Sequence, residues 1–479
     1  MGNRLKMFAD VMAFHQEVSG SCILVSVRFP DREQIKFVVD FGLYQGKDRD
    51  ELYFKRNSEM PFDPEDISFA LVTHNHIDHT GRLPYLVRKG FNGKIYTSYA
   101  TKLVMPYALH DCRRILSENY VREHKKPIYS SQDIDYTMKL VQGVEFNTKI
   151  SITPNIAVTF FQNAHILGAA MILVEITYGD EEPINLFFTG DYNSHNDFFD
   201  AQDIPEEVKN MRISSIMCES TYGTTSTQDI EYGQFKEVLL EEINKGKKHI
   251  IIPALSQQRS QQILYEIKKL QDSNDLSTDI PIFFDGKLAQ IFTRVYMEND
   301  GLIKESMKDF LPKNLVWVYK EYRNEILDNN ERKIIVTTSG MGSHGPAKQY
   351  IPRFCSDPNS SIIFTCYLPD YTVGGKIINT QKGDTVAIYG LMKKIHSDVF
   401  QETEFSSHAK SDELIELLQK FTNLRSVLVN HGEEDVKEKF ANTVFDEVDT
   451  RSVGILNRDY LFRIGSYGVD KTISTKFTR

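Results

Sequence analysis

Thr73-His74-Asn75-His76-Ile77-Asp78-His79-Thr80-Gly81 is the stretch on which the interpretation of this sequence depends. It places three imidazoles and one carboxylate within six residues, directly after the apolar run 67–72. Such a run predicts a buried strand, so the four side chains lie where a strand ends and a loop begins. Neutral imidazole and carboxylate are ligands that zinc prefers. Because the whole chain has only 13 histidines, the stretch predicts a metal site rather than an ordinary polar loop.

The composition of the 479-residue chain is that of a globular protein, with 41% hydrophobic and 25% charged residues. Its length predicts two or three domains. The net charge of −10 argues against a protein that coats nucleic acid non-specifically, although a local basic groove remains compatible with it. The five cysteines form no CxxC pair, and no apolar run approaches the roughly 18–20 residues that cross a bilayer. Since the N-terminus also lacks a signal-peptide pattern, we expect a cytoplasmic protein.

Further acidic and imidazole side chains follow predicted strands in the same way. Asp40 comes directly after the strand 35–39, where a turn aspartate that binds nearby amides is an equal alternative. Three more such residues each follow an apolar run, namely His165, Asp191 and His431. One residue at such a place is more often structural, but the repetition favours a single shared site.

The remaining pattern predicts an interrupted domain. The strands 22–27 and 35–39 read as an antiparallel hairpin, and residues 82–125 as mainly helical. From about residue 212, short apolar strands alternate with helices, which predicts a parallel α/β sheet. Because histidines at strand ends return near residues 410 and 430, we interpret this segment as an insertion. The predicted parts are a first domain over 1–211 and 386–479 and an inserted domain over 212–385.

The strand-end residues together exceed the needs of one metal ion. Seven ligands are too many for one tetrahedral zinc but suit two metals that share a carboxylate and a water. Two metals about 3.5–4 Å apart can activate a hydroxide and stabilise both oxygens of an in-line displacement at phosphorus. A single metal with a water would also serve ester or lactam hydrolysis. The seven predicted ligands are His74, His76, Asp78, His79, His165, Asp191 and His431.

The motifs resemble those of a known family. Residues 73–79 resemble the HxHxDH signature of the metallo-β-lactamase superfamily. Glu219–Gly223, Ser407–Ala409 and Asn430–Glu433 look like the additional motifs of its β-CASP branch of nucleases. Over about residues 14–435 the chain is similar to prokaryotic relatives of the endonuclease subunit of the pre-mRNA cleavage and polyadenylation factor. The resemblance implies an α/β fold: a metallo-β-lactamase αββα sandwich with an inserted parallel α/β (β-CASP) domain.

The resemblance also implies a role for each site residue. Two Zn²⁺ per chain would be bound, one by His74, His76 and His165, the other by Asp78, His79 and His431, with Asp191 between them. Asp40 would orient the ligands. His408 would protonate the leaving oxygen as general acid, while Glu219 fixes its tautomer. The implied catalytic residues are therefore His408, Glu219, Asp191, Asp78 and Asp40.

The function that the resemblance implies is that of a zinc-dependent ribonuclease in RNA processing, which uses a hydroxide activated by two metals. A histidine at the position of His431 is typical of RNA-cleaving members, so single-stranded RNA is the expected partner, and a homodimer is the second partner considered. The alternatives are a metallo-hydrolase of DNA or of small esters, thioesters or lactones, and a non-catalytic RNA-binding subunit. Lys410 and Gly286-Lys287 depart from the usual motifs and leave the substrate contacts open. The cations considered for the phosphate backbone are Arg259, Lys287, Lys348 and Lys376.

Overall fold

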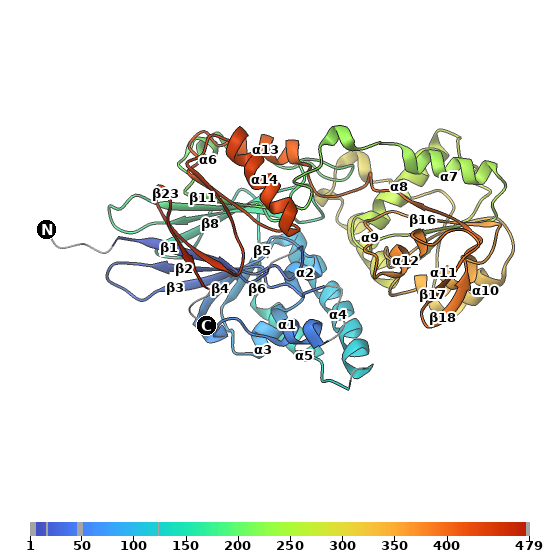
Figure 1. Cartoon of the computed structure of the whole chain (residues 1–479), viewed down its shortest axis with the longest axis horizontal. Helices are drawn as coiled ribbons and strands as arrows, with labels where there is room; N and C mark the ends of the chain where they lie inside the picture. The colour runs from blue at the N-terminus through green and yellow to red at the C-terminus, as the bar shows by residue number, and fades with distance from the viewer. Residues whose placement is uncertain (1–5, 16–17, 46–50, 123, 476–479) are drawn as a thin grey trace. The chain divides into compact units, whose positions relative to one another are not determined.

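The computed structural model describes residues 6–15, 18–45, 51–122 and 124–475 (Figure 1). The chain divides into two compact units. Unit 1 consists of Met1–Asp229 and Ser407–Arg479, and unit 2 of Ile230–Ser406. Unit 2 is therefore an insertion between the two parts of unit 1. Within the described ranges, no helix combines the length and apolar character that crossing a membrane requires.

Unit 1 contains two sheets. The first sheet has the order β23-β22-β1-β2-β3-β4-β5-β6, and the second has the order β21-β20-β11-β10-β9-β8-β7. The strands of the first are β1 (Phe8–Ala13), β2 (Ile23–Arg28), β3 (Ile35–Val39), β4 (Ile67–Leu71), β5 (Lys94–Ser98), β6 (Val141–Val144), β22 (Tyr460–Gly465) and β23 (Gly468–Ser474). Those of the second are β7 (Ile150–Thr153), β8 (Ile156–Gln162), β9 (Ala170–Ile176), β10 (Ile184–Phe188), β11 (Ser215–Cys218), β20 (Ser426–Val429) and β21 (Ser452–Ile455).

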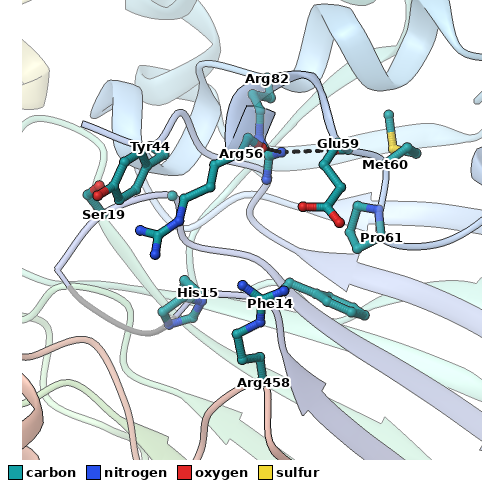
Figure 2. Close-up of a pocket in the computed structure, with 11 residues that line it drawn as sticks. Phe14, His15, Ser19, Tyr44, Arg56, Glu59, Met60, Pro61, Arg82 and Arg458 are labelled. Atoms are coloured by element: carbon teal, nitrogen blue, oxygen red, sulfur yellow. Dashed lines mark hydrogen bonds between the residues drawn. The ribbon is translucent and has the colours of Figure 1, made fainter. Parts of the chain in front are cut away.

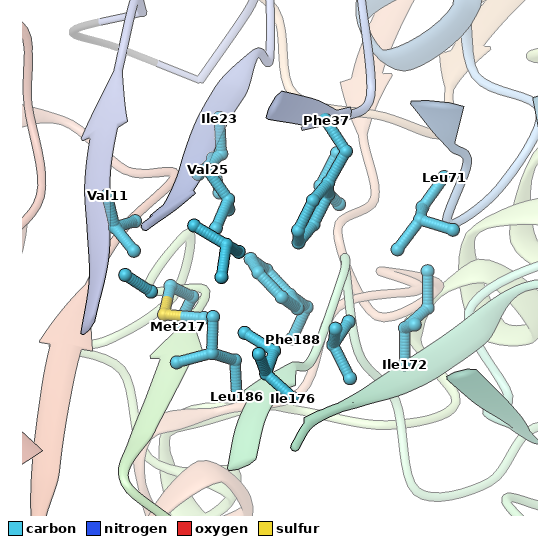
Figure 3. Close-up of a cluster of buried hydrophobic side chains, with 14 of the residues drawn as sticks. Val11, Ile23, Val25, Phe37, Leu71, Ile172, Ile176, Leu186, Phe188 and Met217 are labelled. Atoms are coloured by element: carbon cyan, nitrogen blue, oxygen red, sulfur yellow. The ribbon is translucent and has the colours of Figure 1, made fainter. Parts of the chain in front are cut away.

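The two sheets pack face to face because side chains alternate along each strand. In β3, Phe37 and Val39 enter the core between the sheets, whereas Val38 enters the core on the opposite face. Figure 3 shows Phe37 and Leu71 of the first sheet facing Ile172 and Phe188 of the second. This shared apolar layer fixes the two sheets against each other.

Helices cover the outer face of each sheet in unit 1. The face of the first sheet that carries Val38 packs on the helices that follow β4 and β5, and the outer face of the second packs on the helices near residues 206–210 and in the C-terminal part. The layers are therefore αββα, as predicted. The helices are α1 (Glu51–Ser58), α2 (Ile77–Thr80), α3 (Leu83–Arg88), α4 (Tyr99–Arg122), α5 (Ser131–Leu140), α6 (Glu206–Asn210), α13 (Ser411–Gln419) and α14 (Glu434–Glu447).

Unit 2 is built on a parallel sheet of order β14-β13-β15-β12-β16-β19, with a separate hairpin β17-β18. Its strands are β12 (His249–Pro253), β13 (Ile282–Asp285), β14 (Leu315–Trp317), β15 (Lys333–Thr337), β16 (Ser360–Phe364), β17 (Thr385–Ile388), β18 (Leu391–Lys394) and β19 (Asp398–Gln401). Ile250 and Ile252 point into one core and Ile251 into the other, so helices cover both faces. The helices are α7 (Gln234–Asn244), α8 (Arg259–Asp272), α9 (Lys287–Glu298), α10 (Arg323–Asp328), α11 (Ala347–Phe354) and α12 (Val373–Ile378). The predicted fold class is confirmed.

The edges of the units differ from the predicted domain boundaries at 211/212 and 385/386. The units change at Asp229/Ile230 and at Ser406/Ser407. The first change lies later because β11 pairs with β10 and β20 in the second sheet of unit 1. The second lies later because β19 pairs with β16 in unit 2. The region 82–125, predicted as mainly helical, also contains β5, which pairs with β4.

Glu402 makes the stability of unit 2 depend on pH. Its side chain is buried, and its Oε2 has no hydrogen-bond partner among the described residues. Burial, followed by the nearby charge of Glu404, raises the pKa of Glu402 to about 7. An exposed glutamate has a pKa of about 4.3, so the folded chain holds this proton more tightly than the unfolded chain. The resulting stabilisation is complete below the unfolded pKa and is lost as the pH rises through about 7.

Replacing Glu402 by glutamine is therefore expected to stabilise the chain more at high pH than at low pH. The neutral amide removes the cost of a buried charge, which we expect to amount to about 1–3 kcal/mol at high pH and far less in mild acid. Urea unfolding of the wild type and the variant at both pH values measures the difference. Glu331→Gln, at an exposed position of the same unit, is the control. An equal change in unfolding free energy at both pH values would contradict the assignment.

Candidate metal centre

The predicted ligands lie where strands of both sheets end. β8 and β10 run in the same direction because both are antiparallel to β9, and β10, β11 and β20 are mutually parallel. The carboxyl ends of these four strands therefore share one edge of the second sheet. They are followed by His165, Asp191, Glu219 and His431 respectively. On the first sheet, Asp40 follows β3 and the 73–81 stretch follows β4, which are parallel to each other.

Backbone hydrogen bonds hold the 73–81 stretch in place. It continues from β4 into the single turn α2, which carries Asp78 and His79. The amide of Phe41 donates to the carbonyl of His79 at 2.8 Å, and the amide of Leu43 donates to the carbonyl of Ile77 at 2.9 Å. These hydrogen bonds join the loop after β3 to the turn α2, directly beside the predicted ligands.

Gly42 allows this close approach, and its replacement is expected to damage the site. A Cβ at this position would lie 1.5 Å from the carbonyl oxygen of Asp78 and 2.7 Å from the amide nitrogen of His79. Both are backbone atoms, so Gly42→Ala must displace the ligand turn, at an expected cost of about 3 kcal/mol or more in unfolding free energy. Thermal unfolding together with zinc content measures the effect. Gly301→Ala, whose Cβ would enter open space, is the control, and equal stability of the two variants would contradict the prediction.

One group of ligand atoms surrounds the Nδ1 of His76. This nitrogen lies 3.1 Å from the Nε2 of His74 and 3.1 Å from the Nε2 of His165. The Oδ2 of Asp191 lies 3.6 Å from His74 Nε2 and 3.8 Å from His165 Nε2. Tetrahedral zinc with bonds of about 2.0–2.1 Å places neighbouring nitrogens about 3.3 Å apart. The spacing of these four atoms therefore fits one zinc ion.

A second group lies on the other side of Asp191. Its Oδ1 is 3.3 Å from His79 Nε2 and 3.3 Å from His431 Nδ1. Asp78 Oδ2 lies 3.7 Å from His79 Nε2 and 3.8 Å from His431 Nε2. The two oxygens of Asp191 thus divide between the two groups. All seven predicted ligands are brought together.

The donor atoms of the second group are short of partners. His79 Nε2, His431 Nε2 and Asp191 Oδ1 are buried and have no hydrogen-bond partner among the described residues. Burying polar atoms without partners is costly. A cation bound within this second group would satisfy all three, so the residues fit a metal centre.

The electrostatics of the first group also suit metal binding. Burial lowers the pKa of His76 to about 4 and holds the pKa of His74 and of His165 well below the usual range. These rings are therefore neutral, which is the form that binds metals. Burial raises the pKa of Asp191, but the surrounding histidines, first His431, outweigh burial and keep it well below its usual range. Asp191 is consequently ionised.

Two further contacts orient the ligand rings. Asp40 is buried and accepts hydrogen bonds from the amide and hydroxyl of Thr73 and from His79 Nδ1, each at 2.8 Å. His165 Nδ1 donates to the carbonyl of Ser407 at 2.7 Å. In both rings the remaining nitrogen is left to face Asp191. Such contacts fix the tautomer and direction of metal-binding histidines.

His408 lies beside the first group but is not part of it. Its ring centroid is 4.6 Å from that of His165, and its Nε2 is 3.9 Å from Asp191 Oδ2. Its Nδ1 contacts both oxygens of Glu219, at 2.9 and 3.1 Å. Burial lowers the pKa of His408, but the attraction of Glu219 outweighs it and raises this pKa above the ordinary value. The contact with Glu219 therefore favours the protonated form of His408 next to the cluster.

Lys410, which departs from the usual motif, packs beside this pair. Its side chain is buried, its Nζ donates to the carbonyl of His408 at 3.2 Å, and its ammonium lies 4.0 Å from the ring centroid of Tyr222. Lys410 thus supports the backbone of His408.

One buried histidine near the site is not predicted from the sequence, and one of the cations considered for phosphate is bound to protein carbonyls. His15 follows β1, which was not recognised as a strand, and its Nε2 lies 2.5 Å from the Oδ1 of Asn430, the residue before His431. A histidine after an alternating strand was the available signal. Arg259 is buried, and its guanidinium donates to the carbonyls of Thr365 and Phe405, so it is not a surface cation for phosphate. The other three considered cations are exposed: Lys287, Lys348 and Lys376.

Three family models match the chain in a pattern that follows these elements. The model described as the metallo-beta-lactamase superfamily matches residues 16–131, which contain Asp40 and the 73–81 stretch. The Beta-Casp domain matches residues 260–377, within unit 2. The Zn-dependent metallo-hydrolase RNA specificity domain matches residues 394–453, which contain His408 and His431.

Similar proteins cover most of the chain. A transcription termination factor FttA of Methanosarcina mazei is 27% identical over 467 residues, covering 91% of this chain and 69% of that protein. A second factor of this name, from Pyrococcus abyssi, is 29% identical over 76% of this chain, which spans 57% of that relative. Ribonuclease TTHA0252 of Thermus thermophilus is 26% identical over 84% of this chain and 88% of its own length. With the metal-binding geometry, these similarities show a chain that contains metallo-β-lactamase, Beta-Casp and Zn-dependent metallo-hydrolase RNA specificity domains and that is a metal-dependent hydrolase.

Proposed function

We propose that this protein is a ribonuclease that hydrolyses RNA phosphodiester bonds at a centre of two zinc ions. The observation that carries the proposal is the position of Asp191, whose two oxygens face separate groups of imidazoles. One zinc would be held by His74, His76 and His165 and the other by Asp78, His79 and His431, with Asp191 bridging. When bound, two zinc ions supply Lewis-acid stabilisation of the reacting phosphate and a hydrolytic water of lowered pKa.

The chain's own residues would then donate the proton for the leaving group and orient the imidazole rings. His408 holds its ring with Nδ1 on Glu219, so that Nε2 presents a proton toward the space beside Asp191. In our proposal this proton passes to the oxygen that leaves phosphorus, which is general-acid catalysis. Glu219 maintains the tautomer and the charge of the ring. Asp40 keeps His79 turned toward the metals.

RNA is the proposed substrate for two reasons. One family model that matches the chain is described by RNA specificity, and one relative is named a ribonuclease. Single-stranded RNA is the form that we propose. All five cysteines are buried and unpaired, which supports the proposal of a reducing, cytoplasmic compartment. The homodimer stays a prediction, which light scattering of the purified chain would test.

A substrate panel with a metal assay tests the proposal. We expect zinc-loaded protein to cleave a 5′-labelled single-stranded RNA much faster than the matched DNA or a chromogenic ester. His76→Ala should abolish cleavage and lower the zinc content. His110→Ala, at an exposed position away from the centre, should leave both unchanged. Product lengths also distinguish internal cutting from removal of terminal nucleotides. Faster hydrolysis of the ester or the DNA, or full activity after zinc is stripped, would refute the proposal.

A further inference from the structure

Unit 1 contains a cavity of about 290 Å³ that the proposed chemistry does not use. None of the seven metal ligands is among the described residues that line it. Its charged lining residues are Arg56, Arg82, Arg458 and Glu59. Figure 2 shows the guanidinium ends of Arg56 and Arg458 pointing into the same space as the ring of His15 and the carboxylate of Glu59. Residues distant in sequence thus build one charged cavity.

The formal charge of this lining is +2. Three guanidiniums and one carboxylate contribute to it. His15 adds no charge, because its Nδ1 accepts a hydrogen bond from the amide of Cys22 and its Nε2 is hydrogen-bonded to the amide oxygen of Asn430. An excess of two positive charges in a partly enclosed space favours a small anion that carries about two negative charges.

The three arginines differ in how many contacts their guanidinium groups already make within the protein. Arg82 is buried and donates to the carbonyls of Gly42, Arg56 and Glu59, so it forms a fixed wall. Arg56 lies 4.4 Å over the ring of Tyr44. Neither Arg56 nor Arg458 has an ion pair within the described part of the chain, and both are half-buried. Two guanidiniums are therefore available to a ligand.

We propose that this cavity binds a phosphate monoester, carried by a mononucleotide or by the end of an RNA strand. A phosphate monoester carries about −1.5 to −2 charges at pH 7, which matches the lining. Guanidinium groups recognise phosphate oxygens through paired hydrogen bonds. Phe14, Met60 and Pro61 give the same cavity an apolar wall, and Tyr44 adds an aromatic one. A nucleoside attached to the phosphate would find apolar surface there.

The cavity is linked to the metal centre at two places. His15 joins it to Asn430, which precedes the proposed ligand His431. Arg82 directly follows the 73–81 stretch, and its amide donates to the carbonyl of Phe41 at 3.0 Å. A bound phosphate monoester would therefore lie close to, but outside, the proposed centre.

Calorimetric titration of the zinc-loaded chain with AMP, inorganic phosphate and adenosine tests the proposal. We expect AMP to bind, phosphate to compete with it, and adenosine to bind at least tenfold more weakly. Because the metal centre can also bind phosphate, the decisive comparison is the double variant Arg56→Ala/Arg458→Ala, which should weaken AMP binding at least tenfold with unchanged zinc content. Arg451→Ala, an exposed arginine outside the cavity, should bind AMP as the wild type does.

Two further experiments distinguish a free nucleotide from an RNA end and provide a second variant in case the double variant does not fold. A nuclease-resistant phosphorothioate oligoribonucleotide, with and without a 5′ phosphate, should displace AMP only when phosphorylated if an RNA end can enter. If neither oligonucleotide displaces AMP, the site binds the free nucleotide and not an RNA end. Arg458→Gln alone, which removes the charge but keeps a polar side chain, should weaken AMP binding at least threefold if the double variant does not fold. Equal binding of adenosine and AMP, or unchanged AMP binding in these variants, overturns the proposal whatever the RNA cleavage assay shows.

Discussion

Replacing Asp191 by asparagine is expected to lower RNA cleavage by at least about 10³-fold and to reduce the bound zinc below the wild-type content. The physical reason is that the two oxygens of Asp191 serve different groups: Oδ2 faces His74 and Oδ1 faces His79. An amide has the same shape but no charge, and its nitrogen cannot bind a metal as the second oxygen does. Losing a shared anion in a buried site weakens both metal positions.

The measurement pairs single-turnover cleavage of a labelled RNA with metal analysis of the same sample. Asp197→Asn, farther along the same loop and outside both ligand groups, is the matched control and should keep full activity and zinc. Circular dichroism checks that the fold survives, as expected from the apolar layer between the sheets. Cleavage at the wild-type rate by Asp191→Asn would contradict the proposed role of Asp191 as a carboxylate shared by both groups. Lost cleavage with unchanged zinc content would show that Asp191 acts in the reaction but is not needed to bind zinc.

Much of the fold and most of the geometry at the site could be predicted from the sequence, because each predicted ligand follows a strand that is recognisable locally. Asp191, for example, follows β10, in which every residue is buried, and an unbroken apolar run is the signal of such a strand. The convergence of the ligands then follows from the shared direction of the strands. That shared direction is set by strand pairs distant in sequence, such as β11 with β20.

The parts that could not be predicted depend on partners far away in the sequence. β1 alternates buried and half-buried residues, and its Asp10 pairs with Arg463 of β22 at the other end of the chain. Short strands such as β11 look alike whichever sheet they join, so the predicted first boundary lies before β11, whereas unit 1 continues to Asp229. The hydrogen bonds from Arg259 to carbonyl groups likewise have no local signal, because the sequence alone does not distinguish a buried arginine from an exposed one.

Replacing His408 by alanine is expected to lower kcat for RNA by about 10²–10⁴-fold, the usual contribution of general-acid catalysis, while the zinc content stays that of the wild type. His408 lies outside the two ligand groups, and only its Nε2 approaches Asp191, at 3.9 Å. Its removal should therefore leave metal content and KM nearly unchanged. Glu219→Gln should lower kcat less, because the amide still contacts Nδ1 but no longer stabilises the charged ring.

A change of leaving group isolates the role of His408. A phosphodiester with a p-nitrophenyl leaving group needs no proton to depart, since the phenolate is already stable, whereas an RNA alkoxide does. His408→Ala should thus lose far less activity on the nitrophenyl ester than on RNA. His195→Ala, an exposed histidine on the loop after β10, should retain activity on both substrates. An equal loss of activity on the two substrates would show that His408 positions the phosphate or the metals, because only proton donation depends on how poor the leaving group is.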